Sequence, residues 1–367
     1  MMIFSCIADR FLQGYVLISQ CIYGQHFISP RKYVTTCRTM FVANLKSKTM
    51  ENLNYIYDRK IGEIHFPIQV SDVYYKHRGQ PDKLQDPDHK AIIRGDSGEV
   101  LGMVGSKYEV ITHSQAYRLG RSLFKEVFGS RPSVFKVDMN NKGSYCHVDL
   151  LNPKERISIK GIQKARDYKS GINEEYYPFI RISNSYNHTF ALRYNLGFYR
   201  WKCANGLLMG AGTLGDIVIS HDRPLEESEW YVMDAAEEFA KQINEFDEYV
   251  RRAGSIHIPK ELLEVVTMDM LDRRYGLDQK PKLLKMSEVL RGTVPAYAAE
   301  LGESALAAIN IATDYIKTVE NTQTVNSLQS RAMDWGMKVT GENFNMASYL
   351  NELRTYKERV IEKAHQF

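Results

Sequence analysis

Six residues from Gly210 to Gly215 have the spacing of a dinucleotide-binding loop. They read Gly-Ala-Gly-Thr-Leu-Gly, and glycines at these positions let backbone amides approach a pyrophosphate at the start of a helix. Such a loop must open a helix inside a βαβ unit. Here the next residues, 216–220, have the pattern of a strand, and Pro224 follows soon after. We therefore predict a glycine-rich turn, and a nucleotide-dependent enzyme remains the alternative.

Cysteine, histidine and serine residues form no pattern that indicates metal binding or nucleophilic catalysis. Cys146-His147, His188 and Cys203 lack the short, regular spacing of structural zinc ligands. Residues 220–222 are Ser, His and Asp, the types of a hydrolase triad. Neighbours on an extended chain point to opposite faces, so these three cannot form the relay. We predict no catalytic residue, no metal and no cofactor.

A Cys-Ala-Asn-Gly sequence at 203–206 ends the longest predicted strand. Asn-Gly pairs tolerate positive φ angles, so we predict a sharp turn here. Cys203 would be buried and unligated, Asn205 would bond local backbone, and Gly206 would permit the turn. The alternative is a catalytic Cys203 with Asn205 as its orienting amide, for which His188 is the nearest base in the sequence.

The segment 151–206 carries ten basic residues and four acidic ones. Aromatic residues are interleaved with these cations, and cations beside stackable rings are what a single-stranded nucleic-acid site needs. We predict that this segment contacts phosphates and bases. The predicted contact residues are Lys160, Lys164, Arg166, Arg181, Arg193, Tyr199, Arg200, Trp201 and Lys202.

A two-residue period divides part of this segment into two faces. Alternate residues from Phe190 to Phe198 are apolar and should pack in the core. Arg193, Asn195, Tyr199 and Trp201 fall on the other face, which could meet phosphates and bases. A half-exposed sheet with charged outer residues would have the same pattern without any ligand.

Strand and turn patterns dominate residues 61–219. Paired strands are expected around the turns at 95–98, 140–143 and 185–188. Thr112 or Ser114 should cap a helix that Gly129 ends. Beyond Pro224 the spacing of apolar residues becomes helical, and we expect helices over 232–250, 260–275, 304–319, 325–337 and 347–365. The predicted class is α+β, with antiparallel hairpins and a packed helix in the N-terminal half and a helical C-terminal half.

The first 49 residues differ in composition from the rest, because they hold six basic residues and one acid. We interpret 1–49 as a leader outside the natural protein, which would start at Met50; a targeting peptide is the alternative. From Met50 onward the net charge is −1, against +4 for the whole chain. We therefore expect a leader at 1–49, an α+β domain at 50–222 and a helical region at 223–367.

The five cysteines form an odd set without a CxxC pair, which argues against a disulfide framework. No run of about eighteen apolar residues is present that would predict a membrane span. We expect a protein of the reducing cytoplasm.

Three short motifs resemble a phage- and plasmid-related protein family of unknown function. They are Asn184 to Thr189 with 200–207, then 108–111, and 310–315. The likeness covers about residues 95–350, although position 311 is Ile where the family pattern has Ala. The resemblance implies residence on mobile genetic elements and brings no catalytic residues.

The order of helix, hairpins and basic aromatic sheet is also similar to phage single-strand annealing proteins, which hold DNA in oligomeric rings. By this analogy we expect a homo-oligomeric accessory protein that binds single-stranded DNA in replication or recombination. The other alternative is an inhibitor that docks on a host factor through its helical half.

Overall fold

The computed structural model describes residues 59–76, 82–165, 167–209 and 215–366. The predicted leader at 1–49 lies outside these ranges, and so do Arg166 and residues 210–214 of the glycine-rich segment. The division of the chain at residue 222 stays a prediction, although it falls just before the first helix of the C-terminal half.

A small antiparallel sheet follows the short 3-10 helix η2 (Arg59–Ile64), with which the described chain begins. Its strands are β1 (Ile68–Tyr75), β2 (Leu84–Arg94) and β3 (Val100–Gly105), paired in that order. The predicted hairpin at 95–98 is the β2–β3 turn, in which Gly98 has a φ of 74°. β1 was not predicted, because its polar and apolar residues follow no clean alternation.

Helix α3 (His113–Phe128) has the predicted ends. The side chain of Thr112 accepts a hydrogen bond from the backbone of Gln115, whose own side chain accepts one from Thr112. This capping box satisfies two backbone donors that a helix start leaves open. Gly129 ends the helix in the left-handed region at φ 66°.

A seven-stranded antiparallel sheet follows α3. Its path is β10-β8-β7-β5-β4, and β6 pairs with β7 while β9 pairs with β8. The predicted hairpins around 140–143 and 185–188 are the β4–β5 and β7–β8 pairs. The strands are β4 (Ser133–Met139), β5 (Tyr145–Leu151), β6 (Ile157–Lys164), β7 (Asp167–Ser185), β8 (Leu192–Arg200), β9 (Asn205–Leu208) and β10 (Asp216–Ile219).

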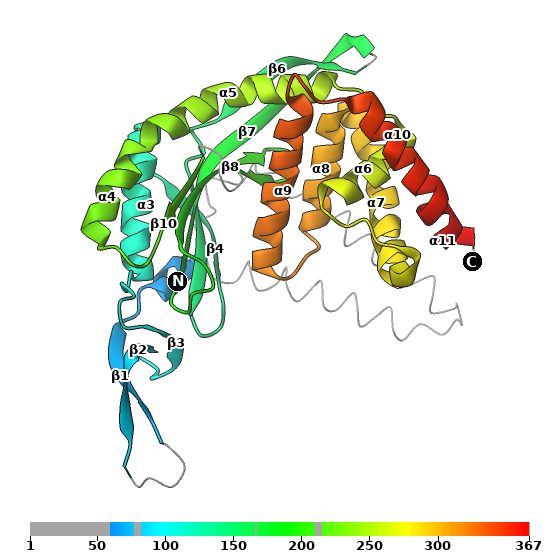
Figure 1. Ribbon diagram of the computed structural model, residues 1–367. Helices are drawn as coiled ribbons and strands as arrows, with labels where there is room; N and C mark the ends of the chain where they lie inside the picture. The colour runs from blue at the N-terminus through cyan, green and yellow to red at the C-terminus, as the bar shows by residue number, and fades with distance from the viewer. Residues whose placement is uncertain (1–58, 77–81, 166, 210–214, 367) are drawn as a thin grey trace, which may run out of the picture. The chain divides into compact units, whose positions relative to one another are not determined.

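One face of this sheet is covered by α3 and by α5 (Ala236–Ser255), as Figure 1 shows. The apolar face predicted for β8 packs here: Phe198 stacks on Phe246 of α5 with ring centroids 3.6 Å apart. The single helix predicted over 232–250 is wrong. The chain instead forms α4 (Leu225–Asp234) and α5, which meet at Ala235.

Helix α8 (Ala305–Ile316) contacts α5, α6, α7 and α9 and buries most of its side chains, while α10 packs against α6 and α11 against α7. The 22-residue α7 was not predicted: its buried residues from Leu283 to Leu301 recur at helical spacing, but Pro295, a residue that usually ends a helix, lies inside it. Helix α9 lies against the opposite face of the sheet from α3 and α5 (Figure 1). The helices of this region are α6 (Leu263–Met270), α7 (Lys280–Leu301), α8, α9 (Thr322–Thr340), α10 (Met346–Tyr356) and α11 (Lys363–Gln366).

The α+β class is confirmed, with antiparallel sheets first and helices after them. One hydrophobic core extends from Ile61 to Ala364 and joins strands and helices. Within the described ranges, no helix combines the length and the apolar character that crossing a membrane requires.

Candidate functional site

Polar side chains cross the face of the large sheet that α9 covers. Residues opposite each other on paired strands share a face, and the strand register aligns two polar rows here. The first row is His147, Ser183 and Arg193, and the second is Asp149, Arg181, Asn195 and Asp216.

A buried ion pair lies at the centre of the second row. Arg181 donates through Nε and Nη2 to the two carboxylate oxygens of Asp149, at 2.6 and 2.7 Å. Burial raises the pKa of Asp149, but the charge and hydrogen bonds of Arg181 outweigh it and hold that pKa below its usual value. The Nη1 of Arg181 donates to Asn326 and Gln329 of α9, at 2.6 and 2.7 Å. The ion pair thus fixes α9 on the sheet.

The prediction that Arg181 and Tyr199 contact a nucleic acid is wrong for this arrangement. Both side chains are buried, and the Tyr199 hydroxyl donates to Asp149 at 2.5 Å. Tyr199 also stacks on Phe179. Because α9 covers this part of the sheet, both side chains bond and stack with other groups of the protein.

Arg200 is likewise interior. It donates to Glu174 at 2.5 and 2.8 Å and to Glu300 of α7 at 2.7 Å. Lys202 is half exposed and lies 3.1 Å from both carboxylates. Two cations and two carboxylates neutralise each other, so Arg200 and Lys202 form a sheet-to-helix tie and not an electropositive surface.

The other predicted contact residues lie apart from one another. Lys160 is exposed on β6, while the Nζ of Lys164 donates to the carbonyl of Ala299 at 3.2 Å. Trp201 packs against Tyr177 with centroids 5.2 Å apart. Of the eight predicted residues that the structure describes, Arg193 is the one that lines the cavity beneath α9.

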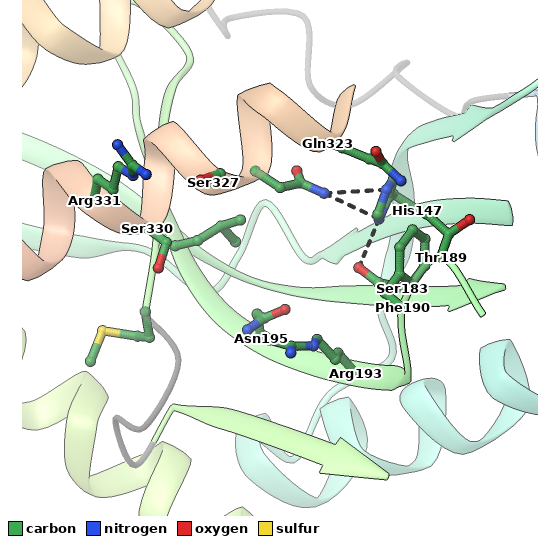
Figure 2. Close-up of a pocket in the computed structure, with 13 residues that line it drawn as sticks. His147, Ser183, Thr189, Phe190, Arg193, Asn195, Gln323, Ser327, Ser330 and Arg331 are labelled. Carbon is green, nitrogen blue, oxygen red and sulfur yellow. Dashed lines mark hydrogen bonds between the residues drawn. The ribbon is translucent and has the colours of Figure 1, made fainter. Parts of the chain in front are cut away.

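That cavity lies between the sheet and the first half of α9, and its volume is about 480 Å³. We call it the central cavity. Figure 2 shows Gln323, Ser327 and Arg331 of α9 on one side and Arg193 and Asn195 of β8 on the other. Among the residues that the structure describes, two arginines and many hydroxyl and amide groups line it, and no carboxylate does. The lining residues are His147, Ser183, Thr189, Phe190, Arg193, Asn195, Leu208, Met209, Gln323, Asn326, Ser327, Ser330 and Arg331.

His147 lies at the inner wall of the central cavity. Its Nδ1 is 2.7 Å from the Ser183 hydroxyl, and the Asn326 amide nitrogen lies 3.2 Å from Nε2 and 3.3 Å from Nδ1 (Figure 2). Phe190 stacks on the imidazole at 4.9 Å. Burial, assisted by the charge of Arg181, lowers the pKa of His147 to about 3. The imidazole is therefore neutral at neutral pH.

Two further depressions adjoin the central cavity. One, of about 280 Å³, shares Phe190 with it and is lined by Lys107, Tyr108, His188 and His221 among others. Tyr108 stacks on His221 at 4.5 Å, and His188 meets the edge of Tyr108 at 4.7 Å. Phe190 lines both this depression and the central cavity, so the two adjoin at this residue.

The other depression, of about 470 Å³, shares Gln323, Ser327 and Arg331 with the central cavity. It is also lined by Arg273 and Tyr275. We call these three adjoining depressions the groove.

The groove carries more positive than negative charge. Its lining includes four cations, Lys107, Arg193, Arg273 and Arg331, and two carboxylates, Asp222 and Asp272. Arg331 pairs with exposed Asp272 at 2.7 Å, and Arg193 lies 3.4 Å from Asp216, whose side chain is almost fully buried. Both arginine side chains stay partly exposed, at 37% for Arg193 and 44% for Arg331.

The glycine-rich segment does not precede a helix. β9 pairs with the second half of β8 and β10 with the first half, and Met209 and Gly215 both bond Leu196. β9 and β10 are therefore two halves of one edge strand, and the prediction of an extended chain after Gly215 is confirmed. Residues 210–214 themselves lie outside the described ranges, while Met209 lines the central cavity.

The predicted turn at 203–206 is wrong in detail. Ala204, and not Gly206, has the positive φ of 50°, and Cys203 is only partly buried. Asn205 reaches beyond its local backbone to the carbonyl of Asn310 and the hydroxyl of Tyr297. The alternative of a Cys203 nucleophile lacks its base, because Cys203 and His188 flank opposite ends of β8.

The remaining histidine and cysteine patterns serve the core. His221 lies against the Glu109 carbonyl at 3.1 Å, and burial raises the pKa of the Cys146 thiol. Within the described residues, no three His, Cys, Asp or Glu side chains gather as metal ligands would.

Sequence reasoning missed the contribution of α9. Its polar residues at 323, 326, 327, 330 and 331 follow helical spacing, which is typical of a solvated face. Such a stripe identifies a groove only once the facing strand is known.

Comparison with known families gives one match. Residues 100–334 match the family described as Domain of unknown function, DUF932. No curated protein and no solved structure matches the chain.

Proposed function

The chain belongs to the DUF932 family, and we propose that it binds single-stranded nucleic acid, in the first instance single-stranded DNA, along the groove. The observation that carries this proposal is that the three depressions adjoin. Phe190 lines two of them, and Gln323, Ser327 and Arg331 line two, so one strand laid across them would meet all three.

The chemistry of the lining supports a strand with charged phosphates and stackable bases. Cations lie in all three depressions, and the aromatic side chains of His188, Phe190 and Tyr275 line their walls. Phosphate contacts give affinity through counterion release, while rings give sequence-tolerant stacking. This assigns binding to a different surface from the one that the basic segment 151–206 predicted.

The resemblance of the Asn184 to Thr189 motif to phage- and plasmid-related proteins supports a role on a mobile genetic element. In this proposal the protein is a cytoplasmic accessory factor of replication or recombination that assembles with copies of itself.

The test is a titration of a labelled single-stranded oligonucleotide at low salt, read by fluorescence anisotropy. We expect binding by the unaltered protein and weaker binding by Arg193→Ala and Arg331→Ala. Arg252→Ala on α5 is the matched control, because Arg252 is as exposed as Arg331 and pairs with Glu248 at 2.6 Å. No binding at low salt, or equal losses in Arg331→Ala and the control, would refute the proposal.

One observation favours a second candidate, a nucleotide-dependent enzyme. Met209 lines the central cavity and directly precedes the glycine-rich segment. A ligand that binds only the native state raises the melting temperature. A thermal-shift series with mononucleotides and dinucleotides therefore tests this candidate, which is lost if none shifts the melting temperature at millimolar concentration.

A further inference from the structure

A chain of hydrogen bonds behind the central cavity has one consistent direction. Guanidinium groups can only donate, so the Asn326 oxygen that lies 2.6 Å from Arg181 Nη1 must be an acceptor. The other end of the same amide is then its NH2 group. This group faces His147 as a donor.

The orientation of Asn326 fixes the tautomer of His147. The Asn326 nitrogen lies almost equally far from both ring nitrogens, 3.2 Å from Nε2 and 3.3 Å from Nδ1, so its distance alone does not choose between them. Nδ1 has the nearer Ser183 oxygen as a partner, whereas a proton on Nε2 would face the NH2 donor, so the lone pair belongs on Nε2. A neutral imidazole with its lone pair on Nε2 carries its proton on Nδ1. Nδ1 therefore donates to the Ser183 oxygen at 2.7 Å.

Ser183 then keeps its own proton for another partner. A hydroxyl that accepts one hydrogen bond can still donate one, and Ser183 lines the central cavity. The nearby acid is unavailable, because Arg181 and Tyr199 occupy the oxygens of Asp149. The hydroxyl proton is thus directed toward the cavity, where no carboxylate is among the lining residues.

We propose that the central cavity holds one phosphate group, with the Ser183 hydroxyl donating to a phosphate oxygen and Arg193 balancing its charge. The identification of this phosphate as part of a nucleic-acid strand rests on the proposed function. Ser183 and Arg193 are cross-strand neighbours on β7 and β8, so both side chains can reach the same phosphate group.

The lining favours phosphate over the edge of a base. A base edge presents donors and acceptors together, whereas the non-bridging oxygens of a phosphodiester only accept and carry a full negative charge. Hydroxyl and guanidinium groups that donate into a cavity without carboxylates match such an acceptor.

The variant that tests this site is Ser183→Ala, measured with a labelled single-stranded oligonucleotide. A hydrogen bond to a charged group is worth about 1.5–3 kcal/mol, so affinity should fall about tenfold or more. Ser330→Ala is the matched control, because Ser330 also lines the cavity but hydrogen-bonds Asp334. The control should change affinity less than about twofold.

A second variant tests the direction of the hydrogen bonds from Asn326 through His147 to Ser183. In Asn326→Asp a carboxylate accepts from both Arg181 and His147, so the imidazole proton moves to Nε2 and Ser183 turns to donate to Nδ1. Adding Ser183→Ala to Asn326→Asp should then cost no further affinity. Nitrogen-15 spectra of histidine-labelled protein, assigned with His147→Gln, should report an Nδ1–H tautomer in the unaltered chain without any ligand.

Inorganic phosphate and thymidine monophosphate distinguish this inference from the proposed function. If the protein binds the oligonucleotide but Ser183→Ala binds within twofold of it, the phosphate site is wrong and the proposed function stands. If the oligonucleotide does not bind, but either small ligand raises the melting temperature only when Ser183 is present, the site stands and the proposed function is wrong. The proposed phosphate site is wrong if His147 has the Nε2–H tautomer, or if Ser183→Ala changes neither the affinity for the oligonucleotide nor the melting-temperature shift with either small ligand.

Discussion

The guanidinium of Arg181 and the carboxylate of Asp149 form a two-bond ion pair beneath α9, with side-chain exposures of 4% and 2%. Removing one member of such a pair leaves an uncompensated charge in the interior. Because Arg181 also bonds Asn326 and Gln329, the loss should loosen α9 as well.

We expect Asp149→Asn to lower the free energy of unfolding by about 3–5 kcal/mol, measured by urea denaturation at pH 7. The folded-state pKa of Asp149 is lowered, so its contribution is present above the unfolded pKa of about 3.9 and is lost as pH falls through the folded value. Asp149→Asn should therefore show less loss of stability below pH 4. A cost below about 1 kcal/mol at pH 7 would contradict this account.

Two buried histidines should make stability depend on pH in a different window. Burial lowers the pKa of His113 to about 4 and that of His147 to about 3, from 6.5. Between pH 4 and 6.5 the unfolded chain binds more protons, so the free energy of unfolding should rise with pH by up to about 1.4 kcal/mol per unit for each histidine. His147→Gln should remove the part of this pH dependence that His147 contributes. If the free energy of unfolding did not change with pH in this window, the two histidines would not be buried in the neutral form.

The two carboxylates that bond Arg200 should contribute unequally to the free energy of unfolding. Glu174 is fully buried, whereas Glu300 is about one third exposed. Glu174→Gln should cost about 3 kcal/mol, since Arg200 then keeps only the partly exposed Glu300 among the carboxylates that the structure places beside it. Glu300→Gln should cost about 1 kcal/mol or less. Thermal or urea unfolding of the two variants decides the order, and a larger cost for Glu300→Gln would overturn it.

Replacing each of two helical glycines by alanine should change stability in opposite directions. A Cβ at Gly120 of α3 would lie 2.4 Å from the Ile182 side chain, so Gly120→Ala should destabilise by about 1–3 kcal/mol. A Cβ at Gly292 of α7 meets nothing within 4 Å, so Gly292→Ala should stabilise by about 0.5–1 kcal/mol. Differential scanning calorimetry checks both signs, and stabilisation by Gly120→Ala would contradict the close packing of α3 on β7.

Local patterns predicted much of the fold. Thr112 and Gly129 marked the ends of α3, and the period of two placed Phe198 in the core and Arg193 on the other face. Helix α7 escaped prediction because Gly292 and Pro295, two residues that disfavour a helix, interrupt a sequence whose buried apolar residues otherwise follow helical spacing.

The candidate site was less accessible to sequence reasoning. Arg181 and Arg200 lie in a segment whose composition is typical of a nucleic-acid site. Their carboxylate partners, Asp149 and Glu174, lie 32 and 26 residues away in the sequence. Asn326 is 145 residues from Arg181. Charge counted along a segment cannot reveal neutralisation that the tertiary fold brings about, nor a cavity formed by strands and a distant helix.

The central claim is that the groove binds the phosphates of a single strand. The most direct measurement is the slope of log Kd against log salt for a single-stranded oligonucleotide, compared among the unaltered protein, Arg193→Ala/Arg331→Ala and Arg252→Ala. Each phosphate contact on a single strand contributes about 0.7 to the slope, so the double variant should lose about 1.4 and Arg252→Ala nothing. Equal slopes for all three proteins would contradict the claim.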